Sequence, residues 1–91
     1  NAMAVENNMT SATSAGPSMA QMPLTFMKTG EVGTIVKVRE KGDVLHHLEN
    51  LGFVVGAEVK IVSEQAGNFI VEVKGAQVAL NKQVAQRIIT R

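Results

Sequence analysis

Apolar and polar residues alternate in several short segments of the chain, as they do in β-strands that have one buried face. These segments are rich in β-branched residues and are separated by breaks that contain glycine, a pattern typical of strands joined by tight turns. The expected strands are residues 34–39, 57–62, 69–74, 77–80 and 88–90. Five short strands in so short a chain predict a mostly β fold that closes into a small barrel.

Between the first and second expected strands, the apolar residues follow the 3.6-residue period of a helix. Asp43 is expected to cap a helix over residues 44–51, and Gly52 is expected to end it in a left-handed conformation. At 100° per residue the apolar residues of this helix form one stripe, which we expect to plug one end of the barrel. The stripe consists of Val44, Leu48 and Leu51.

A second, shorter helix is predicted near the C-terminus, and the N-terminus is predicted to lie outside the domain. Asn81 is expected to cap the short helix over residues 82–87. Residues 1–22 show neither a helical nor a strand period, and we interpret them as a vector remnant followed by a flexible tail. The domain is then residues 23–91, expected to act as a stand-alone module.

The composition narrows the classes of function. Apolar residues make up 45% of the chain, enough for a core, and the absence of cysteine excludes disulfides, thiolate metal sites and a cysteine nucleophile. A net charge of +1 argues against a nucleic-acid-binding protein. The three phenylalanines are expected in the core. No apolar run approaches the length of a membrane span, so we expect a cytoplasmic protein without direct membrane insertion.

Three segments together resemble one known family. They are GEVGTI at residues 30–35, LENLGFVVG at residues 48–56, and VKGAQVAL at residues 73–80 followed by Ala85 and Ile88. In this order and spacing they are similar to FeoA, the ferrous iron transport protein A family, over roughly residues 24–91. We expect the residues that form this signature to serve mainly in folding. They include Gly33, Leu48, Leu51, Gly52, Gly56, Gly75, Leu80 and Ala85.

The resemblance implies a fold, a partner and a place in the cell. The fold would be a five-stranded SH3-like barrel, and the chain would be no enzyme. Its partner would be FeoB, the membrane GTPase that imports ferrous iron, which would hold it at the inner face of the membrane. The oligomeric state stays open. The chain departs from the family pattern at His46 and His47, where many members carry arginine or lysine.

The exposed side of the central helix and the turn after it form the expected partner-binding surface. Val54 and Val55 lie between two glycines, where folding alone does not require two apolar residues. The expected contact residues are His46, His47, Glu49, Asn50, Phe53, Val54 and Val55.

Metal binding and RNA binding are the alternatives to a protein-binding role. No cofactor is expected, but Asp43 and His47 have the i, i+4 spacing of a weak divalent-metal site. A metal-binding regulatory module is therefore the first alternative. An RNA-binding barrel is the second, disfavoured because the chain has few aromatic residues to stack on bases.

Overall fold

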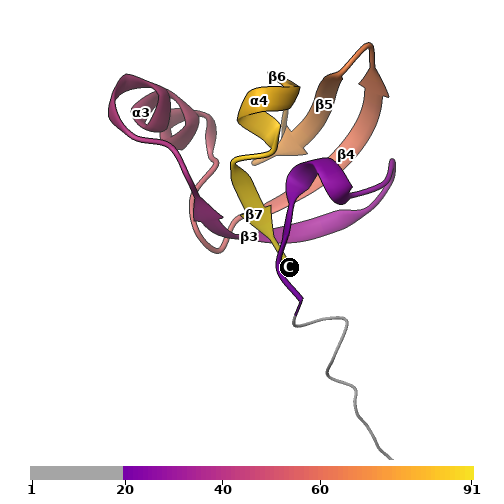
Figure 1. The fold of residues 1–91 in the computed structure, drawn as a ribbon, viewed down its shortest axis with the longest axis horizontal. Helices are drawn as coiled ribbons and strands as arrows, with labels where there is room; N and C mark the ends of the chain where they lie inside the picture. The colour runs from indigo at the N-terminus through magenta and orange to yellow at the C-terminus, as the bar shows by residue number, and fades with distance from the viewer. Residues whose placement is uncertain (1–19) are drawn as a thin grey trace, which may run out of the picture.

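The computed structural model describes residues 20–91 and shows one antiparallel sheet with short helices beside it (Figure 1). The order of strands in the sheet is β2-β7-β3-β4-β5-β6. The strands are β2 (Met22–Pro23), β3 (Val32–Val38), β4 (Glu58–Gln65), β5 (Asn68–Val73), β6 (Ala76–Asn81) and β7 (Ile88–Thr90). The predicted mostly β fold class is confirmed, and all the expected strands are present within a few residues of their predicted bounds.

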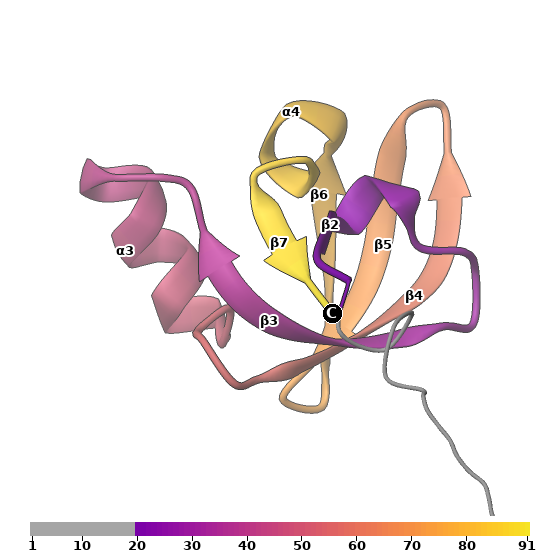
Figure 2. The same ribbon diagram turned by 60° about the horizontal axis from the view of Figure 1, so that its bottom comes forward.

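Strand β3 is shared between the two halves of the sheet, and this curls the sheet into a barrel. Its first half, Val32–Thr34, pairs with β4, whereas Ile35–Val38 pairs with β7, with an irregularity in register between Ile35 and Lys37. Figure 2 shows β3 running beneath both halves. The inward side chains of both halves meet in one core, because alternate residues of each strand point to the same face. The largest fully buried side chains include Ile35, Ile61 and Ile88 of the strands, joined by Leu24 of the N-terminal turn and Phe53 of the loop before β4.

Two tight hairpins set the register of β4, β5 and β6. Residues 66–67 join β4 to β5, and residues 74–75 join β5 to β6, and in each turn both residues have positive φ. Two central residues with positive φ are the mark of the type I′ turn, whose twist matches that of the flanking strands. The second residue of each turn is glycine, but the first is Ala66 or Lys74.

The start of the described chain holds two elements that the sequence pattern did not predict. The two-residue strand β2 pairs with β7, and the 3₁₀ turn η1 (Leu24–Phe26) follows it directly. The predicted boundary between tail and domain therefore falls inside β2, and the expected vector remnant lies outside the described residues. Leu24 is buried, but Phe26 is 70% exposed. The prediction of three core phenylalanines is thus wrong for Phe26, because the turn buries Leu24 and directs Phe26 outward.

Helix α3 (Gly42–Leu51) confirms the predicted central helix and corrects its cap. The capping residue is Lys41, which makes no side-chain capping bond, so the prediction that Asp43 caps the helix is wrong. The helix begins at Gly42, and Asp43 lies inside its first turn. There its carboxylate interacts favourably with the positive end of the helix dipole. Gly52 ends the helix as predicted, with φ of 109° and its N–H bonded to the carbonyls of Glu49 and Leu48.

Helix α3 stands beside the barrel rather than plugging its end (Figures 1 and 2). Of its predicted stripe, Leu48 is buried and Leu51 is half-buried, whereas Val44 remains 45% exposed. The expectation that the whole stripe enters the core is therefore wrong at Val44. The C-terminal half of the helix packs on the barrel, and the N-terminal half stands away from it.

The predicted second helix is confirmed as α4 (Lys82–Ala85). The Asn81 side chain accepts a 2.8 Å hydrogen bond from the N–H of Val84, which is the expected cap. The helix is shorter than the predicted range 82–87, because Gln86 and Arg87 form a closing turn before β7 begins at Ile88.

The signature residues lie where the chain is tightly packed or turns sharply. Leu48, Leu80 and Ala85 are buried. A Cβ added at Gly33 would meet the sulfur of Met27 at 3.0 Å, so the space beside this strand is closed. Gly52, Gly56 and Gly75 all have positive φ.

Candidate docking surface

The expected partner-binding residues are exposed, apart from Phe53, but His47 lies on the side of α3 that faces β6 and not with the others. His46, His47, Glu49 and Asn50 are exposed on α3. Val54 is 37% exposed and Val55 is 70% exposed. Phe53 is completely buried in the core, so including it among the contact residues is wrong. The N–H of Phe53 donates a 2.9 Å hydrogen bond to the Leu48 carbonyl. The buried Phe53 ring therefore anchors the exposed turn that begins at the next residue.

The turn at residues 54–57, which we call the valine turn, is rigidly held. The N–H of Ala57 donates to the Val54 carbonyl at 3.0 Å, and Gly56, the third residue, has φ of 91°. A positive φ at this position is typical of a type II turn. The N–H of Gly56 and the carbonyl of Ala57 also bond Ile35 of β3, at 2.7 Å and 2.9 Å. The turn therefore presents Val55 to solvent at a fixed place on the barrel.

A hollow separates α3 from the barrel on the other side of the helix. It has a volume of about 210 Å³, and its walls are mainly apolar. One wall is the stripe of α3 with His47, and the other is the end of β6 with Val84 of α4. The sequence pattern did not reveal this hollow, because it indicates which face of a helix is apolar and not how far the helix lies from the sheet.

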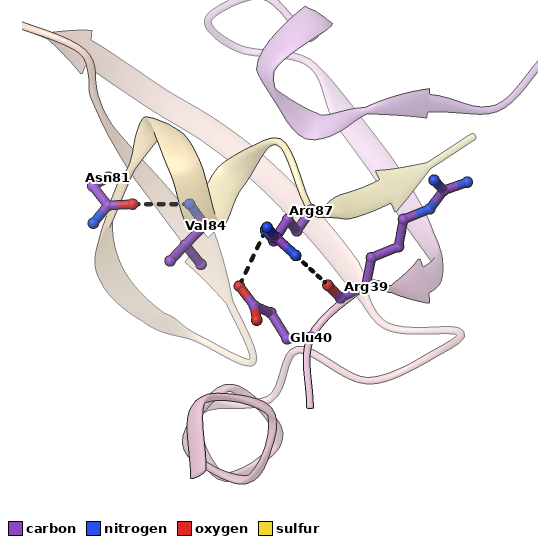
Figure 3. Close-up of polar contacts among 5 residues, drawn as sticks. All are labelled: Arg39, Glu40, Asn81, Val84 and Arg87. Atoms are coloured by element: carbon purple, nitrogen blue, oxygen red, sulfur yellow. Dashed lines mark hydrogen bonds and ion pairs between the residues drawn. The ribbon is translucent and has the colours of Figure 1, made fainter. Parts of the chain in front are cut away.

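An ion pair ties the start of α3 to the segment before β7 (Figure 3). The Arg87 Nε lies 3.6 Å from Glu40 Oε2, and an Arg87 Nη1–H donates to the Arg39 carbonyl at 3.3 Å. The backbone adds a bond of 2.7 Å from the N–H of Arg39 to the Arg87 carbonyl. Together these contacts fix the connection that leads from β3 into α3.

Replacing Arg87 with glutamine should weaken this connection only slightly. Because the Arg87 side chain is 55% exposed, water screens its pairing with Glu40. We expect Arg87→Gln to lower the free energy of unfolding by about 0.2–1 kcal/mol, measured by urea denaturation. A loss of more than about 2 kcal/mol would show that the pair has a larger role than an exposed ion pair can have.

The histidines do not form a recognisable metal centre in the described part of the chain. Asp43 and His47 lie one turn apart on α3, as their spacing predicts. Within residues 20–91, no group of three or more histidine and carboxylate side chains could hold a metal ion.

No helix within residues 20–91 is long and apolar enough to cross a bilayer.

Comparison with known proteins decides the family. The family model of the FeoA domain matches residues 22–91, which is every element of the barrel. The chain belongs to the FeoA family. Membership implies a role in ferrous iron transport, as an accessory domain outside the known enzyme families. A protein of Methanocaldococcus jannaschii that carries the name Fe(2+) transport protein A is 28% identical over 67 residues, which span 74% of this chain and 82% of that protein.

Solved FeoA structures share the fold of this chain. One, an iron uptake regulatory protein, has a TM-score of 0.72 at 26% identity, over 80% of this chain and 97% of its own. Another is FeoA of Stenotrophomonas maltophilia complexed with zinc, described as an SH3 domain protein, with a TM-score of 0.69 at 24% identity. The matched region spans 77% of this chain and 89% of the Stenotrophomonas maltophilia protein. The predicted SH3-like fold is thus confirmed.

Proposed function

We propose that this chain is an accessory protein of ferrous iron uptake that binds the FeoB transporter at its cytoplasmic face and modulates its assembly or activity. The docking surface would consist of the exposed side of α3 together with the valine turn. The observation that carries this proposal is the rigid exposure of Val55, 70% open to solvent on a turn whose backbone is bonded to β3. A preformed apolar contact loses little conformational entropy on binding, which favours affinity.

The polar part of this surface suits recognition more than chemistry. His46, Glu49 and Asn50 are exposed on α3 and offer hydrogen-bond donors and acceptors around the apolar tip. An apolar centre with a polar rim is the usual anatomy of a protein–protein interface. The chain would then act on the transporter by binding alone, and nucleotide hydrolysis would belong to FeoB.

The test is a binding titration against purified FeoB in detergent, with and without a GTP analogue. Burying one valine is worth about 1.5–3 kcal/mol, so Val55→Asp should weaken binding by about tenfold or more. Val32→Asp is the matched control, because Val32 is 58% exposed at the far end of β3 from α3. We expect it to bind within about twofold of the unchanged protein.

Two results would count against the proposal. Equal loss of binding in both variants would move the docking surface away from the valine turn. Absence of binding in every nucleotide state, with folding verified by circular dichroism, would refute the role as a FeoB partner.

A further inference from the structure

The register of β3 and β7 shows which of their side chains face outward. Thr34 and Arg91 exchange both backbone hydrogen bonds, at 3.0 Å each, so their side chains lie on the same face of the sheet. The next pair, Ile35 and Thr90, is buried on the inner face. Side chains alternate along a strand, so the pair of Thr34 and Arg91 faces outward.

The same outer face continues beyond the irregularity in β3. Val38 and Ile88 are an inward pair, because both pack in the hydrophobic core. The pairs on either side of them therefore face outward. These pairs are Lys37 with Ile89 and Arg39 with Arg87. Ile89 is buried but lies outside the core, as expected of an outward side chain that its neighbours cover.

These three outward pairs, which we call the basic rows, carry charge of one sign. Each row contains a basic side chain, and none contains an acidic one. The basic residues are Lys37, Arg39, Arg87 and Arg91, all of them exposed. Within residues 20–91 only Arg87 among them forms an ion pair, with Glu40. Figure 3 shows the Arg39 side chain directed away from that pair and along β7.

Carboxylates border the basic rows without neutralising Lys37 and Arg39. They are Glu58 of β4, Glu40 and Asp43 between β3 and the first turn of α3, and the α-carboxylate of residue 91. Glu58 lies across Thr34, two strands or about 10 Å from Arg91, and Glu40 is occupied by Arg87. In the described part of the chain, neither Lys37 nor Arg39 has a carboxylate within ion-pair distance.

The outer face of β4 and β5 is mixed in charge, unlike the basic rows. Lys60 lies opposite Glu72 in the register, and Glu58 precedes Lys60 by two residues on the same face. Together with Lys74 these residues line one hollow, so acidic and basic side chains alternate there. The excess of positive charge is therefore a property of the β3–β7 face.

The spacing of the cations suits a surface of many negative charges more than a single anion. Successive rows along a strand are about 7 Å apart, so the basic side chains extend over roughly 15 Å and do not converge on one point. No aromatic residue lies in the rows, whereas RNA-binding sheets use aromatic side chains to stack bases. A membrane leaflet of anionic lipids offers charges spread in this way.

The basic rows adjoin the proposed docking surface. Ile35 is bonded to the valine turn on one side of β3 and pairs with Thr90 of β7 on the other. A domain held on a membrane transporter by its valine turn thus has its basic rows beside that contact. The cytoplasmic leaflet is negatively charged, and each lysine or arginine near it strengthens binding about fivefold.

We infer that the outer face of β3 and β7 binds the anionic phospholipid headgroups of the inner membrane leaflet. Lys37 and Arg39 supply the charge that is free of ion pairs, and the headgroup contact orients the domain beside the transporter. The inference rests on the proposed function only in taking FeoB to bring the domain to the membrane.

Co-sedimentation of the full chain with vesicles tests this face without FeoB. The probes are vesicles of phosphatidylcholine alone and of phosphatidylcholine with an equal part of phosphatidylglycerol. We expect binding to the anionic vesicles only, and the double variant Lys37→Gln with Arg39→Gln should bind them about tenfold or more weakly. Equal binding to both kinds of vesicle, or no binding to the anionic kind, would overturn the inference.

Lys60→Gln with Lys74→Gln is the matched control. It removes the same net charge from the mixed outer face of β4 and β5. At physiological salt, charges more than about 8 Å from the membrane are screened, so this variant should bind within about twofold of the unchanged protein. Equal weakening in the two double variants, with folding verified by circular dichroism, would mean that net charge alone attracts the chain and that the inference is wrong.

Two competitors identify the anion. Inorganic phosphate and a single-stranded oligouridylate are added at the phosphate concentration of the vesicle lipid. We expect neither to weaken vesicle binding by more than about twofold, because the basic rows meet several headgroups at once. Displacement by phosphate would make the face a site for a single anion, and displacement by the oligouridylate would assign it to nucleic acid. Either result contradicts the inference.

Binding to FeoB in two surroundings separates this inference from the proposed function. Lys37→Gln with Arg39→Gln should bind FeoB normally in detergent, but about fivefold or more weakly in nanodiscs of the anionic lipid mixture. Normal binding in both overturns the inference while the proposed function stands, and weaker binding in detergent as well assigns the face to FeoB itself. If the unchanged chain binds vesicles but never FeoB, only the proposed function is refuted.

Discussion

Replacing Phe53 with alanine should strongly destabilise this domain. The ring is completely buried and lies in the core beneath the valine turn. Truncating a buried phenylalanine costs about 3–5 kcal/mol, because the transfer free energy is lost and a cavity remains. A domain of about 70 residues has a total stability of about 4–10 kcal/mol, so Phe53→Ala should leave it marginally folded.

The chain supplies a matched control for this experiment. Phe26 is 70% exposed, and Phe26→Ala should change the free energy of unfolding by no more than about 0.5 kcal/mol. Urea denaturation of both variants measures the difference directly. Similar losses in the two would mean that Phe26 is buried in solution, contrary to the structure.

The second large effect is expected at Gly52. Its φ of 109° costs an L-residue about 1–3 kcal/mol, and an alanine Cβ would lie 2.5 Å from the Cγ of Lys74. Lys74 sits in the tight hairpin turn, which fixes its Cβ, so its Cγ can move away only by rotating about χ1 into another rotamer. Overpacking of this kind adds about 1–3 kcal/mol. Gly52→Ala should therefore be strongly destabilising in thermal or urea unfolding.

Gly67→Ala separates the two causes. Gly67 has a similar φ of 83°, but a Cβ there would meet nothing within 4 Å. It should show the backbone cost alone, and the difference between the two variants then measures the contact with Lys74. If both variants lose the same stability, the side chain of Lys74 gives way freely and the close approach carries no energy.

The strands could be predicted from sequence because each carries its own signal. β4 alternates β-branched and polar residues over most of its length, β5 is rich in β-branched residues, and Gly67 marks the turn between them. β2 has only two residues, too few for any period, and it exists because β7 offers it a partner. Leu24 enters the core for the same reason, through the position of the chain and not through a local pattern.

The candidate site was predictable only in part, because a helical period does not specify a distance. It indicated correctly that Val44 and Leu48 share a face of α3, but not that the helix meets the barrel at its C-terminal end alone. The hollow beside β6 lies where the helix stands away from the barrel. Val55 could be predicted as an exposed contact residue because Gly52 and Gly56 on either side of it indicate a turn. The burial of Phe53 could not be predicted in this way, because it depends on long-range packing.

The division of β3 between two partners has a consequence for how the barrel assembles. Ile35 pairs with Thr90, and the backbone of Thr34 exchanges hydrogen bonds with Arg91, so contacts join segments far apart in sequence. Such contacts close large loops before they add stability, which slows folding to about milliseconds or longer. Until β7 arrives, β2 and the second half of β3 lack their sheet partner. A ribosome-bound chain in which residues 88–91 have not yet emerged therefore exposes an unfinished core, and the barrel closes only once β7 is free to pair with β2 and β3.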